Sequence, residues 1–179
     1  MIDRAVRIGM IGCGTQANVH FAAIKELTEQ IATVAAVCDL DDERLAAACQ
    51  LWPQARSAKD YHEMLSPGDL DLVIVATMPN THEAMSLASL EAGANVLCEK
   101  PFMMNATEAQ NVLAKAETAG LRVQLGTNMR YMPSSQYLHR LIEGDSIGTP
   151  VYAKAWGCHD YPPVWAPHYH LATSGGGVL

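Results

Sequence analysis

The stretch that decides the fold is V-R-I-G-M-I-G-C-G-T-Q-A, residues 6–17. Its first six residues form a short apolar run typical of a buried strand, and the apolar residues that follow at helical spacing are Ala17, Phe21, Ile24 and Leu27. Between this strand and helix lies the pattern G-x-G-x-x-A, formed by Gly12, Cys13, Gly14, Thr15, Gln16 and Ala17. A strand that enters a glycine turn and then a helix is the opening unit of a doubly wound α/β fold.

Outward from this turn, apolar runs alternate with helical patterns. Strands are expected at residues 33–38, 56–58, 72–76, 96–98 and 122–125, and helices at residues 41–52, 61–65, 80–91 and 105–120. The last two helices each begin with a predicted capping pair, Asn80 with Glu83 and Asn105 with Glu108. The buried face of the last helix is expected at Ala109, Val112, Leu113 and Ala116. This alternation predicts parallel strands joined by right-handed crossovers, with helices on both faces of the sheet.

The character of the chain changes after residue 126. A helix is expected at residues 134–143 and a strand at residues 151–158, and three consecutive glycines occupy residues 175–177. We therefore predict a Rossmann-type doubly wound parallel sheet in residues 1–126. The tail, residues 127–179, is too short to be a sound second domain by itself.

Composition excludes several kinds of partner and site. The formal net charge of −7 and the pI of about 5.4 argue against a nucleic-acid or an anionic-membrane partner. No apolar run approaches membrane-spanning length and the N-terminus lacks a secretory signal, so a cytoplasmic protein is expected. The five cysteines form no C-x-x-C pair and are interpreted as buried reduced thiols. No metal site is expected, because the spacing of His159, His168 and His170 fits no standard zinc pattern.

Two features of the first β-α-β unit point to a dinucleotide. Gly12 permits a tight turn, Gly14 lets a pyrophosphate approach the backbone, and Ala17 keeps the helix close to the strand. Asp39, at the end of the second strand, can accept hydrogen bonds from an adenosine ribose diol. The next three residues, 40–42, offer no arginine and would repel a 2′-phosphate. NAD is therefore the expected cofactor, with NADP the weaker alternative.

A third cluster, Glu99-Lys100-Pro101, follows the fifth strand. Open parallel sheets bind ligands outside the carboxyl ends of their strands, so Lys100 is expected near the nicotinamide. Pro101 restricts the backbone of Lys100, which helps to fix the direction of the ammonium group. Lys100 is the catalytic candidate, because it can hydrogen-bond a substrate hydroxyl and stabilise alkoxide character as hydride leaves. A solvated lysine in a strand-end turn is the alternative.

Residues 76–82 (A-T-M-P-N-T-H) and 91–101 (E-A-G-A-N-V-L-C-E-K-P) resemble the Gfo/Idh/MocA oxidoreductase family. The glycine motif with His20 beyond it, N-M-R-Y-M-P at residues 128–133 and the closing G-G-G-V-L are similar in kind and order. The resemblance implies a Rossmann domain followed by an α/β domain with a large open sheet, of which residues 127–179 would be the incomplete start. Residues 150–179 are too few to build that sheet, so we expect the fragment to associate or to have a poorly ordered tail. The resemblance also implies a site in which NAD lies across the glycine turn and Asp39. The residues expected near the nicotinamide half of the cofactor are Pro79, Asn80, His82, Glu99, Lys100 and Asn128. Arg130 and Tyr131 would lie at the domain junction, where Tyr131 would face the substrate.

The activity implied by the resemblance is NAD-dependent hydride transfer at the carbinol carbon of a sugar, polyol or related small molecule, in a homo-oligomer. In the family, the glycine-rich segment leads into a helix whose Asp and His handle the proton, and the sequence stops at Leu179, before those positions. The parent protein is thus expected to be a dehydrogenase. Two alternatives remain open for this chain: an NAD-binding module without turnover, and a glycosidase that retains its NAD.

Overall fold

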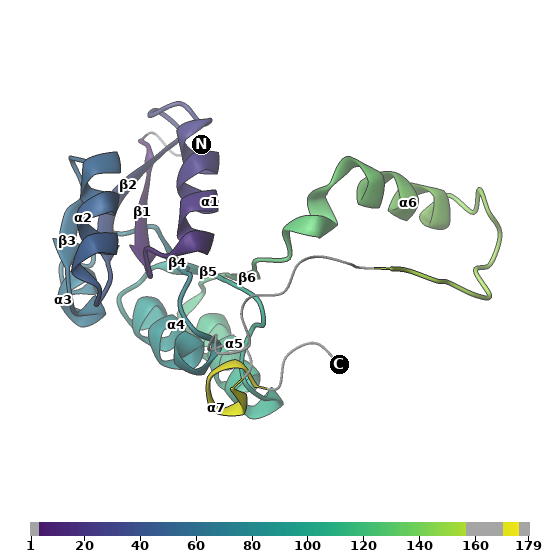
Figure 1. The fold of residues 1–179 in the computed structure, drawn as a ribbon. Coiled ribbons are helices and arrows are strands. Elements are labelled where there is room, and N and C mark those ends of the chain that lie inside the picture. The colour runs from purple at the N-terminus through teal and green to yellow at the C-terminus, as the bar shows by residue number, and fades with distance from the viewer. Residues whose placement is uncertain (1–3, 157–169, 176–179) are drawn as a thin grey trace.

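The computed structural model describes residues 4–156 and 170–175, in which a parallel sheet is flanked by helices (Figure 1). Up to β6, strands and helices alternate as β1 (Val6–Ile11), α1 (Thr15–Lys25), β2 (Ala32–Cys38), α2 (Asp42–Leu51), β3 (Arg56–Ala58), α3 (Tyr61–Leu65), β4 (Leu72–Val75), η1 (Pro79–Thr81), α4 (His82–Glu91), β5 (Asn95–Cys98), α5 (Ala106–Ala119) and β6 (Val123–Leu125). They are followed by η2 (Asn128–Tyr131), α6 (Pro133–Glu143) and α7 (Leu171–Ser174).

The six strands lie in the order β3-β2-β1-β4-β5-β6, and every neighbouring pair is parallel. Chain order reverses between β1 and β4, whose last residues, Ile11 and Val75, are paired in register. Doubly wound sheets bind their ligands in the crevice at such a switch point, outside the carboxyl ends of the strands. The predicted fold class is therefore confirmed, and the topology alone selects the loops after β1 and β4 as the centre of a site.

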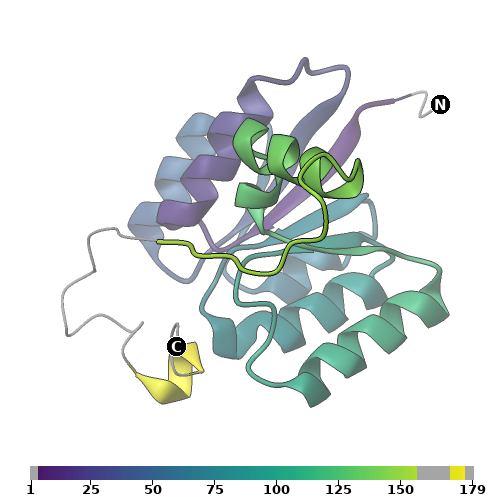
Figure 2. The same ribbon diagram turned by 90° about the vertical axis from the view of Figure 1, so that its right-hand side faces the viewer.

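Helices cover both faces of the sheet (Figure 2), and the central strands are apolar on both sides for that reason. In β4, Val73 and Val75 pack with Val112 of α5, whereas Ile74 packs with Phe21 of α1. None of the three β4 side chains is more than 3% exposed. The unbroken apolar run in the sequence thus reflects alternate side chains that enter two separate cores.

Two apolar residues predicted to be buried are exposed instead. Helix α1 ends at Lys25, so Leu27 lies beyond the helix with 44% of its surface exposed. In α5, Val112 and Ala116 are buried, but Leu113 is 52% exposed. Both errors have the same cause, because a residue at the margin of a helical stripe, or just past its end, satisfies the spacing without facing the sheet.

The two predicted capping pairs differ in outcome. At α5, the Asn105 side chain accepts a hydrogen bond from the Glu108 amide, and Glu108 in return accepts one from the Met104 amide, so this pair is confirmed. At α4 the prediction is wrong, because residues 79–81 form a 3-10 turn and Thr81 precedes the helix. Glu83 instead accepts a hydrogen bond from Asn111 of α5 and thereby joins the two helices.

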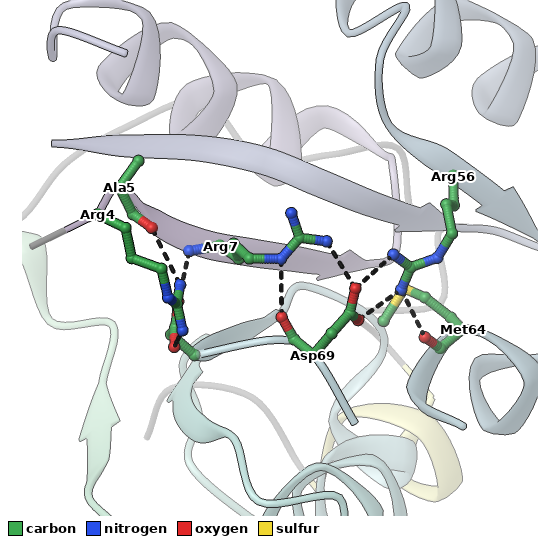
Figure 3. A network of polar contacts seen from close by, with 7 residues as sticks. Arg4, Ala5, Arg7, Arg56, Met64 and Asp69 are labelled. Atoms are coloured by element: carbon green, nitrogen blue, oxygen red, sulfur yellow. Dashed lines mark hydrogen bonds and ion pairs between the residues drawn. The ribbon is translucent and has the colours of Figure 1, made fainter. Parts of the chain in front are cut away.

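At the amino edge of the sheet, opposite the switch point, Asp69 joins two strands (Figure 3). Its carboxylate accepts hydrogen bonds from Arg7 of β1 at 2.6 Å and from both terminal nitrogens of Arg56 of β3 at 2.8 and 2.9 Å. Beside it, Asp71 pairs with Arg4 at 2.6 and 2.7 Å. These ion pairs bind the strand ends together on the side of the sheet that carries no predicted site residue.

The chain after β6 departs from the expected pattern. Helix α6 is present as predicted, but none of its residues is buried, and Figure 1 shows it standing apart from the sheet. Residues 151–156 of the predicted strand at 151–158 are not in a strand, and residues 157 and 158 lie outside the described part. Helix α7 returns to the body of the domain and contacts η1. In the described ranges, no helix is long and apolar enough to cross a membrane.

Candidate functional site

The turn after β1 has a conformation and a packing that demand glycine at its first position. Gly12 has φ +87°, and a Cβ there would lie 2.6 Å from the carbonyl oxygen of Ala76, at the end of β4. Its amide donates to the Cys38 carbonyl of β2 at 2.8 Å. The turn is therefore fixed against both neighbouring strands at the switch point. Ala17, on the inner side of α1, is completely buried, as expected for close packing of helix and strand.

The start of α1 offers unpaired amide groups. Gly14 is the N-cap, no side chain caps the helix there, and no acidic residue occupies the first turn. A Cβ added at Gly14 would meet only Arg44 Nη1, at 3.7 Å, so the side of the turn that Gly14 faces has room for a ligand. Free N–H groups at the start of an 11-residue helix suit a phosphate. Thr15 and Gln16 supply the first residues of that helix.

Asp39 is joined to the glycine turn by a direct hydrogen bond. Its Oδ2 accepts from the Cys13 amide at 2.7 Å and its Oδ1 from the Asp41 amide at 2.9 Å. Each carboxylate oxygen retains a second lone pair, so these bonds orient the group without exhausting it. The Cys13 side chain is buried, and burial, followed by the charge of Asp39, raises the pKa of its thiol to about 12. Cys13 is therefore an unreactive packing residue.

Arg44 is a residue that reasoning from the sequence overlooked. It is the third residue of α2, and its guanidinium reaches toward Gly14 while lying 4.0 Å from the Asp41 carboxylate. Residues 40–42, immediately after the strand, contain no cation, and Arg44 lies two residues beyond them. The available signal was helical geometry, because a long side chain in the first turn of α2 reaches back over the N-terminal edge of its helix.

Glu99 is a buried carboxylate held by three partners. Its Oε1 accepts from His20 Nε2 at 2.8 Å and Gln16 Nε2 at 3.2 Å, and its Oε2 from the Lys100 amide at 3.2 Å. Burial raises the pKa of Glu99, but hydrogen bonds from His20, the Lys100 amide and Gln16 outweigh that effect, so the net pKa lies below its ordinary value. The group is therefore ionised at neutral pH. The close packing of Gly126, whose added Cβ would lie 3.0 Å from Oε1, closes the cluster on the side of β6.

Lys100 is exposed, and within the described ranges its ammonium makes no hydrogen bond or ion pair. The peptide bond between Lys100 and Pro101 is cis, a feature that the sequence pattern did not predict. Lys100 follows β5, so its backbone lies at the same sheet edge as the glycine turn and Asp39. An unpaired cation at this edge is available to an oxygen atom of a ligand.

His82 lies behind this lysine turn and is completely buried. Its Nδ1 contacts the carbonyl oxygens of Pro101 at 2.9 Å and Phe102 at 3.3 Å, and its Nε2 contacts that of Thr77 at 3.2 Å. The contacts of the imidazole therefore go to backbone of the two loops that border the site. A place for His82 beside a nicotinamide ribose stays a prediction.

Comparison with known proteins identifies the family. Residues 6–127 match the family model described as an oxidoreductase family with an NAD-binding Rossmann fold, Gfo/Idh/MocA. The chain belongs to this family. The match runs from the start of β1 to the second residue after β6, and it includes the glycine turn, Asp39 and Glu99-Lys100-Pro101. The expected family and its cofactor, NAD, are thereby confirmed.

Among curated Gfo/Idh/MocA proteins, the chain is 33% identical over 145 residues to D-apiose dehydrogenase of Paraburkholderia graminis, and 37% identical over 147 residues to inositol 2-dehydrogenase 2 of Saccharopolyspora erythraea. These matches cover 81% and 80% of this chain but only 38% and 42% of those proteins. A solved structure of the WlbA dehydrogenase of Chromobacterium violaceum, in complex with NADH and UDP-GlcNAcA, matches with a TM-score of 0.78 at 30% identity, covering 83% of this chain and 42% of that one. The chain thus spans less than half the length of these relatives.

Some of the Gfo/Idh/MocA-type positions lie around a hollow of about 230 Å³ between α1, β5, β6 and η2. Gln16, His20 and Glu99 line it together with Asn128 and Tyr131 of η2, and its surface is mostly apolar. Pro79 is buried and Asn80 is exposed in η1, whereas Arg130 is exposed and accepts a hydrogen bond from Gln136 through its carbonyl oxygen. The predicted residues from five separate loops are therefore gathered at one edge of the sheet.

Proposed function

We propose that residues 1–126 seat NAD across the carboxyl edge of this sheet, with the pyrophosphate on the amide groups between β1 and α1. The observation that carries the proposal is the turn at Gly12, which only glycine can occupy, followed by an uncapped helix start. Asp39, fixed by the Cys13 amide, would accept hydrogen bonds from the adenosine ribose diol and would repel a 2′-phosphate. Pro79, Asn80, Glu99, Lys100 and Asn128 would border the nicotinamide half.

We further propose that the parent protein is a dehydrogenase of a sugar, polyol or related small hydroxy compound. When bound, NAD supplies the hydride acceptor. Lys100 would donate a hydrogen bond to the substrate oxygen and stabilise the negative charge that grows there as the carbinol carbon loses hydride. The relatives named above as D-apiose and inositol dehydrogenases support this substrate class.

The second part, residues 127–179, is proposed to begin a separate domain that meets the substrate through Tyr131 and takes part in a homo-oligomer. Two features favour a boundary near residue 126. Neither core cluster has a buried residue beyond Ala116, and α6 contributes none. Exposed apolar side chains also accumulate after the boundary, at Met129, Tyr131, Met132, Tyr137, Leu138 and Ile142.

Calorimetry tests the cofactor proposal with the full chain. We expect NADH to bind and NADPH to bind more weakly, and we expect Gly14→Trp to abolish binding because its side chain fills the space for the pyrophosphate. Gly120→Asn is the matched control, because Gly120 has φ +66° at the C-terminus of α5, with open space around it. Asparagine tolerates that conformation, so binding should be unchanged. Absence of heat with the native chain would refute the proposal.

The proposed dehydrogenase activity is tested by incubating the protein with NAD and a panel of polyols and sugars and following the absorbance of NADH. We expect NADH to form with the native protein, and we expect Lys100→Met to abolish its formation. NADH binding without any turnover would favour a nucleotide-binding module. Cleavage of a glycoside without net formation of NADH would favour the glycosidase alternative.

A further inference from the structure

The loop that carries Lys100 is held from two sides by histidines of two different helices. On one side, His20 of α1 contacts the Glu99 carboxylate at 2.8 Å, and that carboxylate accepts the amide of Lys100 itself. On the other side, His82 of α4 contacts the carbonyl oxygen of Pro101 at 2.9 Å. The residues immediately before and after Lys100 are thus each fixed by one imidazole.

We propose that His20 and His82 are positioning residues that together set the place of the Lys100 ammonium, an inference that rests on the proposed role of Lys100. The Lys100 side chain is exposed, and in the described part of the chain it makes no hydrogen bond or ion pair. The position from which it extends is therefore fixed only by its backbone. Glu99 and His82 are 5% and 0% exposed, and solvent therefore cannot replace the contacts they make.

The partner of each histidine decides which of its ring nitrogens must donate the hydrogen bond. Carbonyl oxygens only accept hydrogen bonds, so His82 must carry its proton on Nδ1 to hold Pro101. Glu99 is likewise an acceptor, so His20 must donate from Nε2. The two histidines hence use opposite ring nitrogens for the same purpose.

This opposition gives an unusually specific set of variants. Asparagine places its amide nitrogen near the position of Nδ1, and glutamine places its own near the position of Nε2. His82→Asn and His20→Gln therefore retain the donor that faces the lysine loop, whereas His82→Gln and His20→Asn withdraw it. His82→Gln places its donor toward the Thr77 carbonyl instead, so it can bond to the loop after β4 while it releases Pro101.

The position of Lys100 is observable without cofactor or activity. Reductive methylation with ¹³C-formaldehyde labels the lysine amines, and Lys100→Arg assigns the Lys100 signal among those of Lys25, Lys59, Lys115 and Lys154. We expect His82→Gln and His20→Asn to displace the Lys100 signal in the NMR spectrum, with the other four unchanged. His82→Asn and His20→Gln should leave it in place, as should the exposed control His139→Gln on α6.

An unmoved Lys100 signal in the folded His20→Asn variant would overturn the proposal. Equal displacement of the signal by all four variants would also overturn it, because that is the result expected if the two histidines only stabilise the fold. If His82→Gln does not fold, the His20 pair decides alone, because the His20 side chain is 19% exposed and tolerates replacement more readily. Loss of NADH binding in the calorimetric experiment would refute the proposed function and leave this measurement unaffected, so the two failures are distinguishable.

Discussion

At the residue scale, the site depends on a few charged side chains whose partners are backbone groups. Asp39 accepts from the Cys13 amide and Glu99 from the Lys100 amide, so each carboxylate fixes the loop next to it. The sequence pattern identified both residues but predicted that they contact the cofactor. Motif spacing indicates where a side chain starts, whereas its hydrogen-bond partners depend on loops that only the folded sheet brings together.

Glu99→Gln tests the energetic part of this arrangement. Replacing a buried, hydrogen-bonded carboxylate should lower the free energy of unfolding at neutral pH by about 1–3 kcal/mol. The pKa of Glu99 is below its ordinary value of about 4.5, so its contribution to stability is present above that value and is lost as pH falls through the folded-state pKa. Thermal unfolding across pH should show two curves that differ at pH 7 and approach each other as pH falls below the ordinary value of the carboxyl pKa. A constant difference at every pH would contradict this account.

Arg44→Ala tests the residue that the sequence reasoning overlooked. Because the guanidinium lies over Gly14, it is placed to contact the phosphates of a dinucleotide. The side chain is 60% exposed, so we expect a modest loss of NADH affinity, of about three- to tenfold, that decreases with added salt. Arg122→Ala, before β6 at the opposite edge of the sheet, should leave the affinity unchanged in the same titration. Equal affinities for the native chain and Arg44→Ala at low salt would remove Arg44 from the site.

At the scale of elements, regular periodicity predicted almost every helix and strand through β6. Strands β1 and β3 and helix α3 have the predicted bounds. In β1 the reason is plain, because an apolar run that ends at the Gly12 turn leaves few alternatives. The α4 start and the conformation of residues 151–156 could not be predicted in this way. Pro79 begins a 3-10 turn that displaces the helix start past Asn80. Residues 151–156 have a β-rich composition but are not in a strand, since composition alone does not supply a partner strand.

Asp69→Asn tests how the sheet edge is held together. Hydrogen bonds from Arg56 are the main cause of the lowered pKa of Asp69; burial opposes them, and the hydrogen bond from Arg7 adds to the lowering. Because the carboxylate is partly exposed, we expect the loss of unfolding free energy to be only about 1 kcal/mol, and smaller at high salt. That corresponds to a decrease in Tm of about 2–4 °C. Asp42→Asn, which removes a single exposed partner of Lys59, should change Tm less in the same melts; an equal change would show that the network adds nothing.

At the scale of the whole molecule, the domain is well packed up to β6 and open after it. The sheet edge that carries the site and the face of α6 are joined through η2, which supplies Asn128 and Tyr131 to the hollow beside Glu99. The proposed second domain would therefore begin at the site itself. Sequence composition indicated a boundary near residue 126, but it gave no position for α6, since an amphipathic helix is placed by whatever covers its apolar face.

The exposed face of α6 leads to the last prediction. Tyr137, Leu138 and Ile142 are 58%, 54% and 42% exposed at neighbouring positions of one helix, and an apolar surface of this kind favours self-association. Leu138→Glu combined with Ile142→Glu should reduce the average mass measured by light scattering at high concentration, and should reduce binding of a hydrophobic dye. Leu27→Glu combined with Ile31→Glu is the matched control, because these two side chains are as exposed, at 44% and 55%, and lie between α1 and β2, away from α6. Charge alone would make both double variants equally less associated, whereas a contribution specific to α6 requires that only the α6 variant lose mass.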